Sequence, residues 1–184
     1  MSRGFPWLAL LFIAIGVSVI ISGCAKTAEV QQRAAEGMDL IDRLAPITPV
    51  APDMHVSRNS SVIRNGLQKD ALILVAPVSV RASLRGSSGR LMLVGLATPM
   101  FNIGDGIQMD LYLSRAGERH FIGNRYFDSG RRAEDRKWIP IAFPVDLGKE
   151  DELEIKISAG PQGDLVADWL ALSSLRLMQR KVAP

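Results

Sequence analysis

The chain has 184 residues, of which 47% are hydrophobic and 22% are charged, and its formal net charge is +3. This small excess of positive charge excludes a nucleic-acid-binding role, which needs a strongly basic patch. With a single cysteine, Cys24, the chain can form neither an internal disulfide nor a thiolate metal site.

The N-terminal residues have the pattern of a bacterial lipoprotein signal. Arg3 is the only charge before Cys24, residues 8–21 are apolar or small, and Ile21-Ser22-Gly23-Cys24 has the form of a lipobox. These features predict cleavage before Cys24 and acylation of its thiol. An uncleaved transmembrane helix is the alternative, although the apolar stretch is slightly shorter than the roughly 20 residues of a usual span.

In both cases the rest of the chain is expected to be tethered to a membrane on its non-cytoplasmic side, in the bacterial cell envelope. Ala25 follows the predicted lipid attachment site. An Asp there is the usual signal for retention in the inner membrane, so Ala25 favours the outer membrane if the source is Gram-negative.

The segment after Cys24 is predicted to be a tether. Apolar residues recur at helical spacing over 27–45, and this predicts a short amphipathic helix, either a stalk or a docking helix. Pro46, Pro49 and Pro52 then predict an extended linker. We therefore expect a signal or anchor at 1–23, a tether at 24–52 and one domain at 53–184. The apolar positions of the predicted helix are Val30, Ala34, Met38, Ile41 and Leu44.

From residue 53 the period of hydrophobicity changes to two, which is typical of half-buried strands. Turn residues separate the strands, and Pro140 and Pro144 restrict their strand to the edge of a sheet or to an irregular ladder. We expect about eight strands and no second helix, in an all-β antiparallel β-sandwich, a jelly roll. The predicted strands include 78–84, 91–96, 107–113, 120–127, 139–147, 153–157 and one or two within 165–178.

The order of short motifs over roughly residues 70–178 resembles the galactose-binding-like jelly-roll family. Members of this family occur as carbohydrate-binding modules, so the resemblance implies a binding module whose ligand lies at loops on one end of the sandwich. It also leaves a structural calcium ion open. The motifs are Gly104-Asp105-Gly106-Ile107, Trp138-Ile139-Pro140, Val145-Asp146-Leu147, Leu153-Glu154-Ile155-Lys156-Ile157, Gly160-Pro161 and Asp168-Trp169.

Positive charge is concentrated between residues 115 and 137. The stretch is either a solvated strand edge, which charge protects from aggregation, or a contact for an anionic polymer or an acidic protein surface. Within it, Arg131, Arg132 and Arg136 are the candidate ligand contacts. The seven cations are Arg115, Arg119, Arg125, Arg131, Arg132, Arg136 and Lys137.

Aromatic residues are the second set of candidates, because their rings both stack on sugars and fill cores. Trp138 is off phase with Ile139 and faces either a ligand or the core. Tyr126 is either a half-exposed strand residue or part of a binding face. Trp169 is predicted to pack in the core.

No catalytic site is predicted. His55 and His120 have no metal-ligand spacing, and no Gly-x-Ser-x-Gly elbow occurs. We interpret Asp105 as a turn cap, Asp128 as solvated, and Asp168 as a hydrogen-bond partner of backbone at a strand end. The predicted function is therefore a membrane-anchored, non-enzymatic binding module that recognises a glycan or exopolysaccharide. The alternative is an accessory or scaffold subunit of a membrane protein complex.

Overall fold

The computed structural model describes residues 37–47 and 56–179. Cys24, the predicted signal segment, His55 and most of the predicted linker lie outside these residues. Within the two ranges, no helix is long and apolar enough to cross a membrane.

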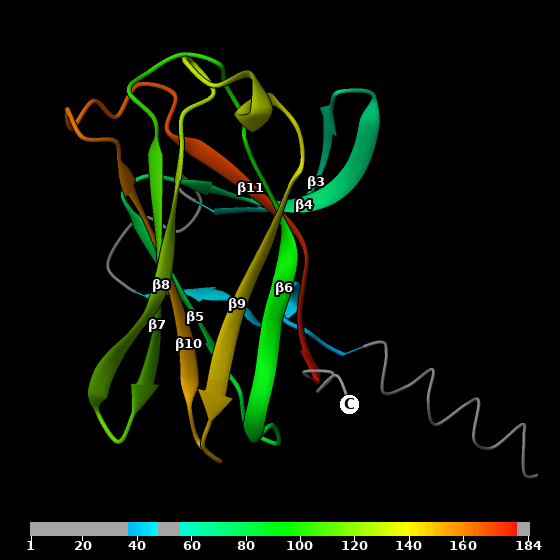
Figure 1. The fold of residues 1–184 in the computed structure, drawn as a ribbon, viewed down its shortest axis with the longest axis vertical. Helices are drawn as coiled ribbons and strands as arrows, with labels where there is room; N and C mark the ends of the chain where they lie inside the picture. The colour runs from blue at the N-terminus through cyan, green and yellow to red at the C-terminus, as the bar shows by residue number, and fades with distance from the viewer. Residues whose placement is uncertain (1–36, 48–55, 180–184) are drawn as a thin grey trace, which may run out of the picture. The chain divides into compact units, whose positions relative to one another are not determined.

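The described residues form two antiparallel sheets that pack face to face (Figure 1). This confirms the predicted all-β sandwich. The first sheet has the order β3 (Val56–Arg64), β4 (Leu67–Val75), β11 (Trp169–Gln179), β6 (Gly89–Pro99) and β9 (Ile139–Leu147), and β1 (Met38–Asp39) also pairs with β11. The second has the order β2 (Ala45–Pro46), β5 (Val78–Ser83), β10 (Glu152–Ala159), β7 (Ile107–Arg115) and β8 (Glu118–Phe127). Two short 3₁₀ helices complete the described elements, η1 (Ile41–Arg43) and η2 (Ala133–Arg136).

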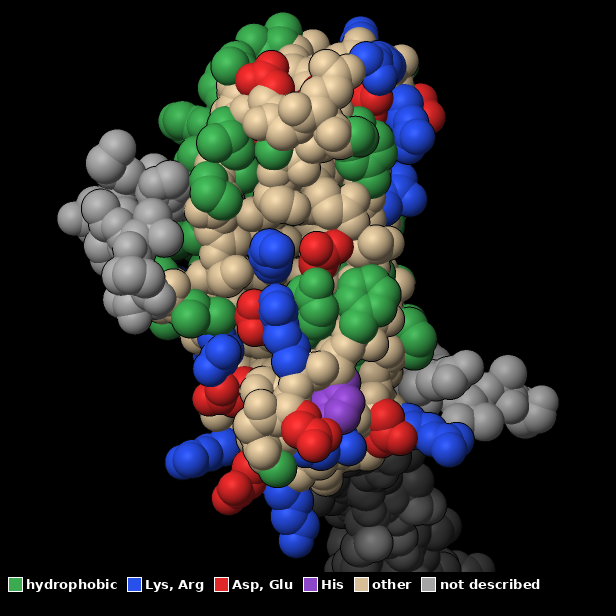
Figure 2. Space-filling model, turned by 90° about the vertical axis from the view of Figure 1, so that its left-hand side faces the viewer, with side chains coloured by type: hydrophobic (Ala, Val, Ile, Leu, Met, Phe, Trp, Pro, Cys, Tyr) green, Lys and Arg blue, Asp and Glu red, His purple; other side chains and the backbone are tan. Residues whose placement is uncertain are grey.

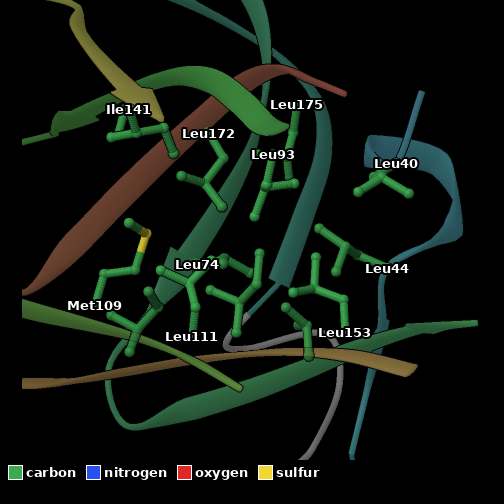
Figure 3. Packing of buried hydrophobic residues seen from close by; sticks show 14 of the residues in the cluster. Leu40, Leu44, Leu74, Leu93, Met109, Leu111, Ile141, Leu153, Leu172 and Leu175 are labelled. Carbon is green, nitrogen blue, oxygen red and sulfur yellow. The ribbon is translucent and has the colours of Figure 1, made fainter. Parts of the chain in front are cut away.

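The core lies between the sheets and is built from alternate strand residues. In β7, for example, Met109 and Leu111 are fully buried while the intervening Asp110 is half-buried. Leu111 and Leu172 of β11 point into the same apolar layer (Figure 3). Burial of such side chains is the main favourable contribution to folding. The period of two in the sequence thus corresponds to the residues that face this core.

The prediction of an edge position for the strand with two prolines is confirmed. β9 is the last strand of its sheet and pairs only with β6 among the described strands. Pro140 and Pro144 are both exposed. A proline has no N–H to donate, so an edge strand is where it costs no ladder hydrogen bond.

The predicted helix over 27–45 is wrong in its described part. Residues 38–46 form β1, η1 and β2, so that one 3₁₀ turn lies between two short strands. Leu40 and Leu44 are both fully buried in the core. Of these two, only Leu44 lies on the apolar face of the predicted helix. One turn is sufficient to bury both residues, because β1 pairs with β11 and β2 pairs with β5. The sheets thus take in residues that precede the expected boundary at residue 53.

A β-bulge in β11 keeps the apolar side chains of this central strand on one face. Leu170 and Leu172 point inward, and after one extra residue Leu175 and Leu177 do so again. The extra residue is Ser174, whose φ is +53°. A bulge adds one residue to one strand and so restores the inward phase of the residues that follow it.

Leu40→Ala is expected to lower the free energy of unfolding by about 2–5 kcal/mol, because it leaves a cavity in the core. Arg43→Ala, at the exposed last residue of η1, should change it by no more than about 0.5 kcal/mol. Urea unfolding of the two variants and the wild type measures both values. Equal stability of all three proteins would contradict the inclusion of residues 38–46 in the core.

Candidate functional site

Three loops meet at the end of the sandwich that is uppermost in Figure 1. They are residues 100–106, 128–138 and 160–168, and we call them together the loop end. Ser129 Oγ donates a hydrogen bond to the Phe101 carbonyl at 2.5 Å, which joins the second loop to the first. Gln162 N donates to Asp105 Oδ2 at 2.5 Å, which joins the third loop to the first.

Asp105 lies at the centre of these contacts and is only 6% exposed. Its carbonyl accepts a hydrogen bond from the Tyr126 hydroxyl at 2.5 Å, while its carboxylate accepts the one from Gln162. The flanking Gly104 and Gly106 have φ of +89° and +100°, a region that side-chain-bearing residues rarely adopt. The Gly-Asp-Gly motif therefore turns the chain so that one buried carboxylate ties two loops together.

The loop 128–138 is folded by its own charged residues. Asp128 N donates to Asp135 Oδ2 at 2.7 Å, and Asp128 Oδ1 accepts from Arg131 N at 3.1 Å. Both aspartates are buried, so the prediction that Asp128 is solvated is wrong. Arg136 donates to the carbonyls of Ser129 and Gly130 at 2.7 and 2.9 Å. Short acidic side chains thus satisfy backbone donors at Asp128 and Arg131, outside η2.

The three arginines predicted as ligand contacts therefore have different surroundings. All three arginines are exposed, but the Arg136 guanidinium is bonded to carbonyls of its own loop. The Arg132 guanidinium lies 5.6 Å from the centre of the Tyr126 ring. Burial, reinforced by the nearby Asp128 and Asp105 charges, raises the pKa of Tyr126, so its hydroxyl stays protonated and donates to Asp105. The exposed pair of arginines is what this loop offers to a ligand.

Other cations of the 115–137 stretch are paired with acids on the sheet rather than grouped at the loop end. Arg115 donates to both carboxylate oxygens of Asp151, at 3.0 and 2.7 Å, and Arg119 donates to Glu154 at 2.6 Å. Figure 2 shows positive and negative side chains mixed on this face. Of the two interpretations of the 115–137 stretch, a solvated strand edge is therefore the one that fits Arg115 and Arg119.

Trp138 is buried, with 7% exposure, in a small apolar cluster. Its indole Nε1 donates to the Leu67 carbonyl at 3.1 Å. Neither ring face is free to stack on a ligand. Trp138 was expected to face either a ligand or the core, and in the structure it packs in the core.

Trp169 was predicted in the core, and this prediction is wrong because the residue is 39% exposed. It is the first residue of β11 and is off phase with the inward Leu170, a signal that was present in the sequence. Its ring meets Phe101 edge to face, with centroids 5.4 Å apart and planes at 81°.

Exposed apolar side chains accompany this pair on the same two loops. Figure 2 shows hydrophobic side chains gathered at the upper end of the molecule. Contiguous exposed apolar surface on a folded domain marks an interaction site more often than isolated residues do. We call the set the aromatic patch, and it consists of Phe101, Ile103, Leu165, Val166 and Trp169.

Asp168 directly precedes Trp169 of the aromatic patch, and it is 1% exposed. Neither of its carboxylate oxygens has a hydrogen-bond partner, so its predicted bond to backbone is wrong. Burial, with the charges of Asp105 and Asp164 as further causes, raises the pKa of Asp168 to about 7. A buried carboxyl without partners takes up a proton or pairs with a cation.

Asp105 and Asp168 are also the residues that suit the structural calcium ion left open by the sequence. Asp105 Oδ1 lacks a partner as well, which gives three buried oxygens of the kind that calcium prefers. In the described ranges no group of three or more His, Cys, Asp and Glu residues gathers around one point. A calcium ion held by these two carboxylates is a proposal, tested below.

Comparison of the sequence with models of known protein families and with curated proteins finds no match. Solved structures do match. One is the CBM51 module from Clostridium perfringens GH95 in complex with methyl-galactose, with a TM-score of 0.51 and 12% identity over 77% of this chain and 99% of that one. Another is the CBM22-1 xylan-binding domain from Paenibacillus barcinonensis Xyn10C, with a TM-score of 0.52 and 10% identity over 81% and 93%. The chain therefore has the galactose-binding-like jelly-roll fold, as the sequence resemblance predicted.

Asp168→Asn is expected to remove a pH dependence of stability. The Asp168 carboxyl has a pKa of about 7 in the fold and returns to the ordinary 3.8 on unfolding. Between these values the folded state holds a proton that the unfolded state has lost, so stability should fall as pH rises from about 4 to about 7 and level off above. Thermal unfolding across this range measures the slope, and Glu150→Gln, at an exposed position away from the Asp168 carboxyl, is the control.

The same proteins test calcium. Above pH 7, calcium should raise the melting temperature of the wild type and leave that of Asp168→Asn unchanged, because a ligand that binds only the folded state stabilises it. A wild type that responds to pH and not to calcium would reject the ion. A wild type without the pH slope would contradict the buried, unpartnered carboxyl.

Proposed function

We propose that this protein is a non-catalytic glycan-binding module of the bacterial cell envelope, held at a membrane through an acylated Cys24. The main observation in favour of glycan binding is that Phe101 and Trp169 form an exposed aromatic pair at the loop end. The fold of the domain, which carbohydrate-binding modules share, supports the same conclusion.

The aromatic pair suits a sugar ring because it offers a large, rigid apolar surface. Indole and phenyl faces attract the C–H faces of a pyranose, and their few rotatable bonds keep the entropy cost of binding low. The edge-to-face contact fixes the two rings relative to each other. Trp169 is further held by its backbone, which donates to the Ala167 carbonyl at 2.9 Å and accepts from Met100 N at 2.8 Å.

Polar groups on the neighbouring loop complete the proposed site. The exposed residues Arg131 and Arg132 offer donors to ligand hydroxyls or acidic groups. A patch of aromatic surface with a few polar groups is the usual composition of a ligand site. The neighbouring structures were solved with methyl-galactose in one case and named for xylan in the other, so these are the first ligands to try.

The carboxylates at the loop end support binding rather than catalysis. Glycoside hydrolysis needs two accessible carboxyl groups on either side of the scissile bond. Asp105 and Asp168 are both buried, and Asp105 is bonded to the backbone of another loop. Both are therefore buried away from a substrate, and Asp105 in addition joins two loops.

A second candidate function is an accessory subunit of a membrane protein complex. The aliphatic residues Ile103, Leu165 and Val166 of the aromatic patch favour it, because exposed aliphatic side chains suit a protein interface better than a sugar. Both candidates use the loop end, so purification of the protein from its native membrane with whatever accompanies it distinguishes them.

Trp169→Ala is expected to weaken saccharide binding about tenfold or more, because truncating a tryptophan that dominates a binding site costs about 2 kcal/mol or more. Phe121→Ala is the matched control, since Phe121 is an exposed aromatic residue on β8 outside the aromatic patch. Calorimetric titration with methyl-galactose, xylohexaose and envelope polysaccharides measures the affinities.

Salt separates the two parts of the proposed site. Binding through the aromatic patch should persist at high salt, whereas any contribution lost in Arg131→Ala/Arg132→Ala should disappear there, because the screening length falls from about 8 Å to about 3 Å at 1 M salt. Wild-type affinity in Trp169→Ala would remove the aromatic patch from the site.

Acylation of Cys24 predicts that protein extracted from membranes lacks residues 1–23 and carries a lipid mass increment. Cys24→Ser should retain residues 1–23, because the predicted peptidase acts on the lipidated cysteine. Intact-mass measurement of both proteins decides the matter. An unmodified wild-type chain that begins at Met1 would establish the transmembrane alternative.

A further inference from the structure

The first sheet divides in two along β11, and a cavity lies at the division. β11 pairs with β4 only over residues 169–172, and it pairs with β1 at Arg176 and Leu177. Between these two pairings lies a cavity of about 450 Å³. Residues of β4, η1 and the bulges of β3 and β11 line it, and we call it the fork pocket.

Two of the residues that line the fork pocket have a left-handed backbone. Asn59, in the bulge of β3, and Ser174, in the bulge of β11, each have a φ of +53°. A side-chain-bearing residue in this region is strained, and such residues concentrate at binding and active sites. Here the strain brings an amide and a hydroxyl to the wall of one cavity.

The lining of the fork pocket is polar and nearly neutral. Asp39, Asp42 and Asp70 face two cations, Lys69 and Arg176. Arg176 Nε lies 3.7 Å from Asp39 Oδ2, so one acid and one base already compensate each other. A single excess negative charge disfavours phosphate, sulfate and acidic polymers as ligands.

The groups of the fork pocket match hydroxyls. A hydroxyl both donates and accepts, and it therefore needs acceptors and donors close together. The lining residues include Asp42 and Asp70, whose carboxylates can accept, Lys69, whose ammonium can donate, and Asn59 and Ser174, whose side chains can do both. Its volume lies within the usual range of small-ligand sites, about 300–1,000 Å³.

We infer that the fork pocket is a second saccharide site, which binds a neutral, hydroxyl-rich segment of a glycan by hydrogen bonds without aromatic stacking. The inference rests on the proposed function for the class of ligand but not for the location. Ser174 lies five residues along β11 from Trp169, roughly 15 Å at the rise of a strand. A domain with two weak sites gains avidity for a repeating polymer.

The left-handed residues make a clean test possible. Asn59→Gly/Ser174→Gly removes both polar side chains at positions where glycine is the favoured residue, so the fold should be retained. The matched control is Asn65→Gly, which has a φ of +48° in the turn after β3 and does not line the fork pocket. Trp169→Ala removes the proposed loop-end site independently.

The probes are methyl-galactose and xylohexaose at tens of millimolar, followed by amide chemical shifts of the mature protein. In the wild type, in Asn65→Gly and in Trp169→Ala, the amides of residues 59, 70 and 174 are expected to shift with one or both probes. In Asn59→Gly/Ser174→Gly the affinity read from Asp70 should be about tenfold weaker, the loss expected for two hydrogen bonds.

The experiment can reject the fork-pocket site and the loop-end site independently of each other. If no amide around the fork pocket shifts in the wild type, or if the double glycine variant binds as Asn65→Gly does, the inference is overturned whatever happens at Trp169. If fork-pocket shifts persist while the Trp169 indole does not respond, the second site stands and the proposed function at the loop end fails.

Discussion

The constraint on which the rest of the structure depends is the path of β11 through the first sheet. This strand pairs with β4, β6 and β1, and its inward leucines form a large part of the core. The spacing of these four leucines requires the bulge at Ser174, because in a regular strand the last two would face away from the core. Gly95 of β6 accommodates the bulge: a Cβ there would lie 2.9 Å from Leu175 Cδ1.

The loop end is organised differently, by buried carboxyl groups instead of apolar packing. Asp105 and Asp135 each accept a backbone hydrogen bond from another part of the loops, which compensates for the loss of water around them. Asp168 has no such compensation. The buried carboxyl next to the exposed tryptophan therefore lowers the stability of the fold when it is ionised.

The sequence predicted the half-buried strands, because alternation of apolar and polar residues follows directly from burial of one face. The alternation in 107–113 and 153–157 specified half-buried strands, and two prolines specified an edge. The errors have physical causes. The spacing of Met38, Ile41 and Leu44 fits one face of a helix as well as one turn between two strands, and only pairing with β11 and β5 decides between them. Trp169 was assigned by residue type, although its phase already opposed burial. The fork pocket depends on which strands pair, which no local pattern contains.

The entry of the chain into both sheets has a mechanical consequence. Residues 38–46 contribute one short strand to each sheet and two fully buried leucines to the layer between them. A pull on the N-terminal side of the domain, as an anchored chain holding a polymer would experience, is thus applied to the interior and to both sheets at once. The load must shear the backbone pairing of Met38 and Asp39 with β11 and withdraw Leu40 before the strands that carry the loops are disturbed.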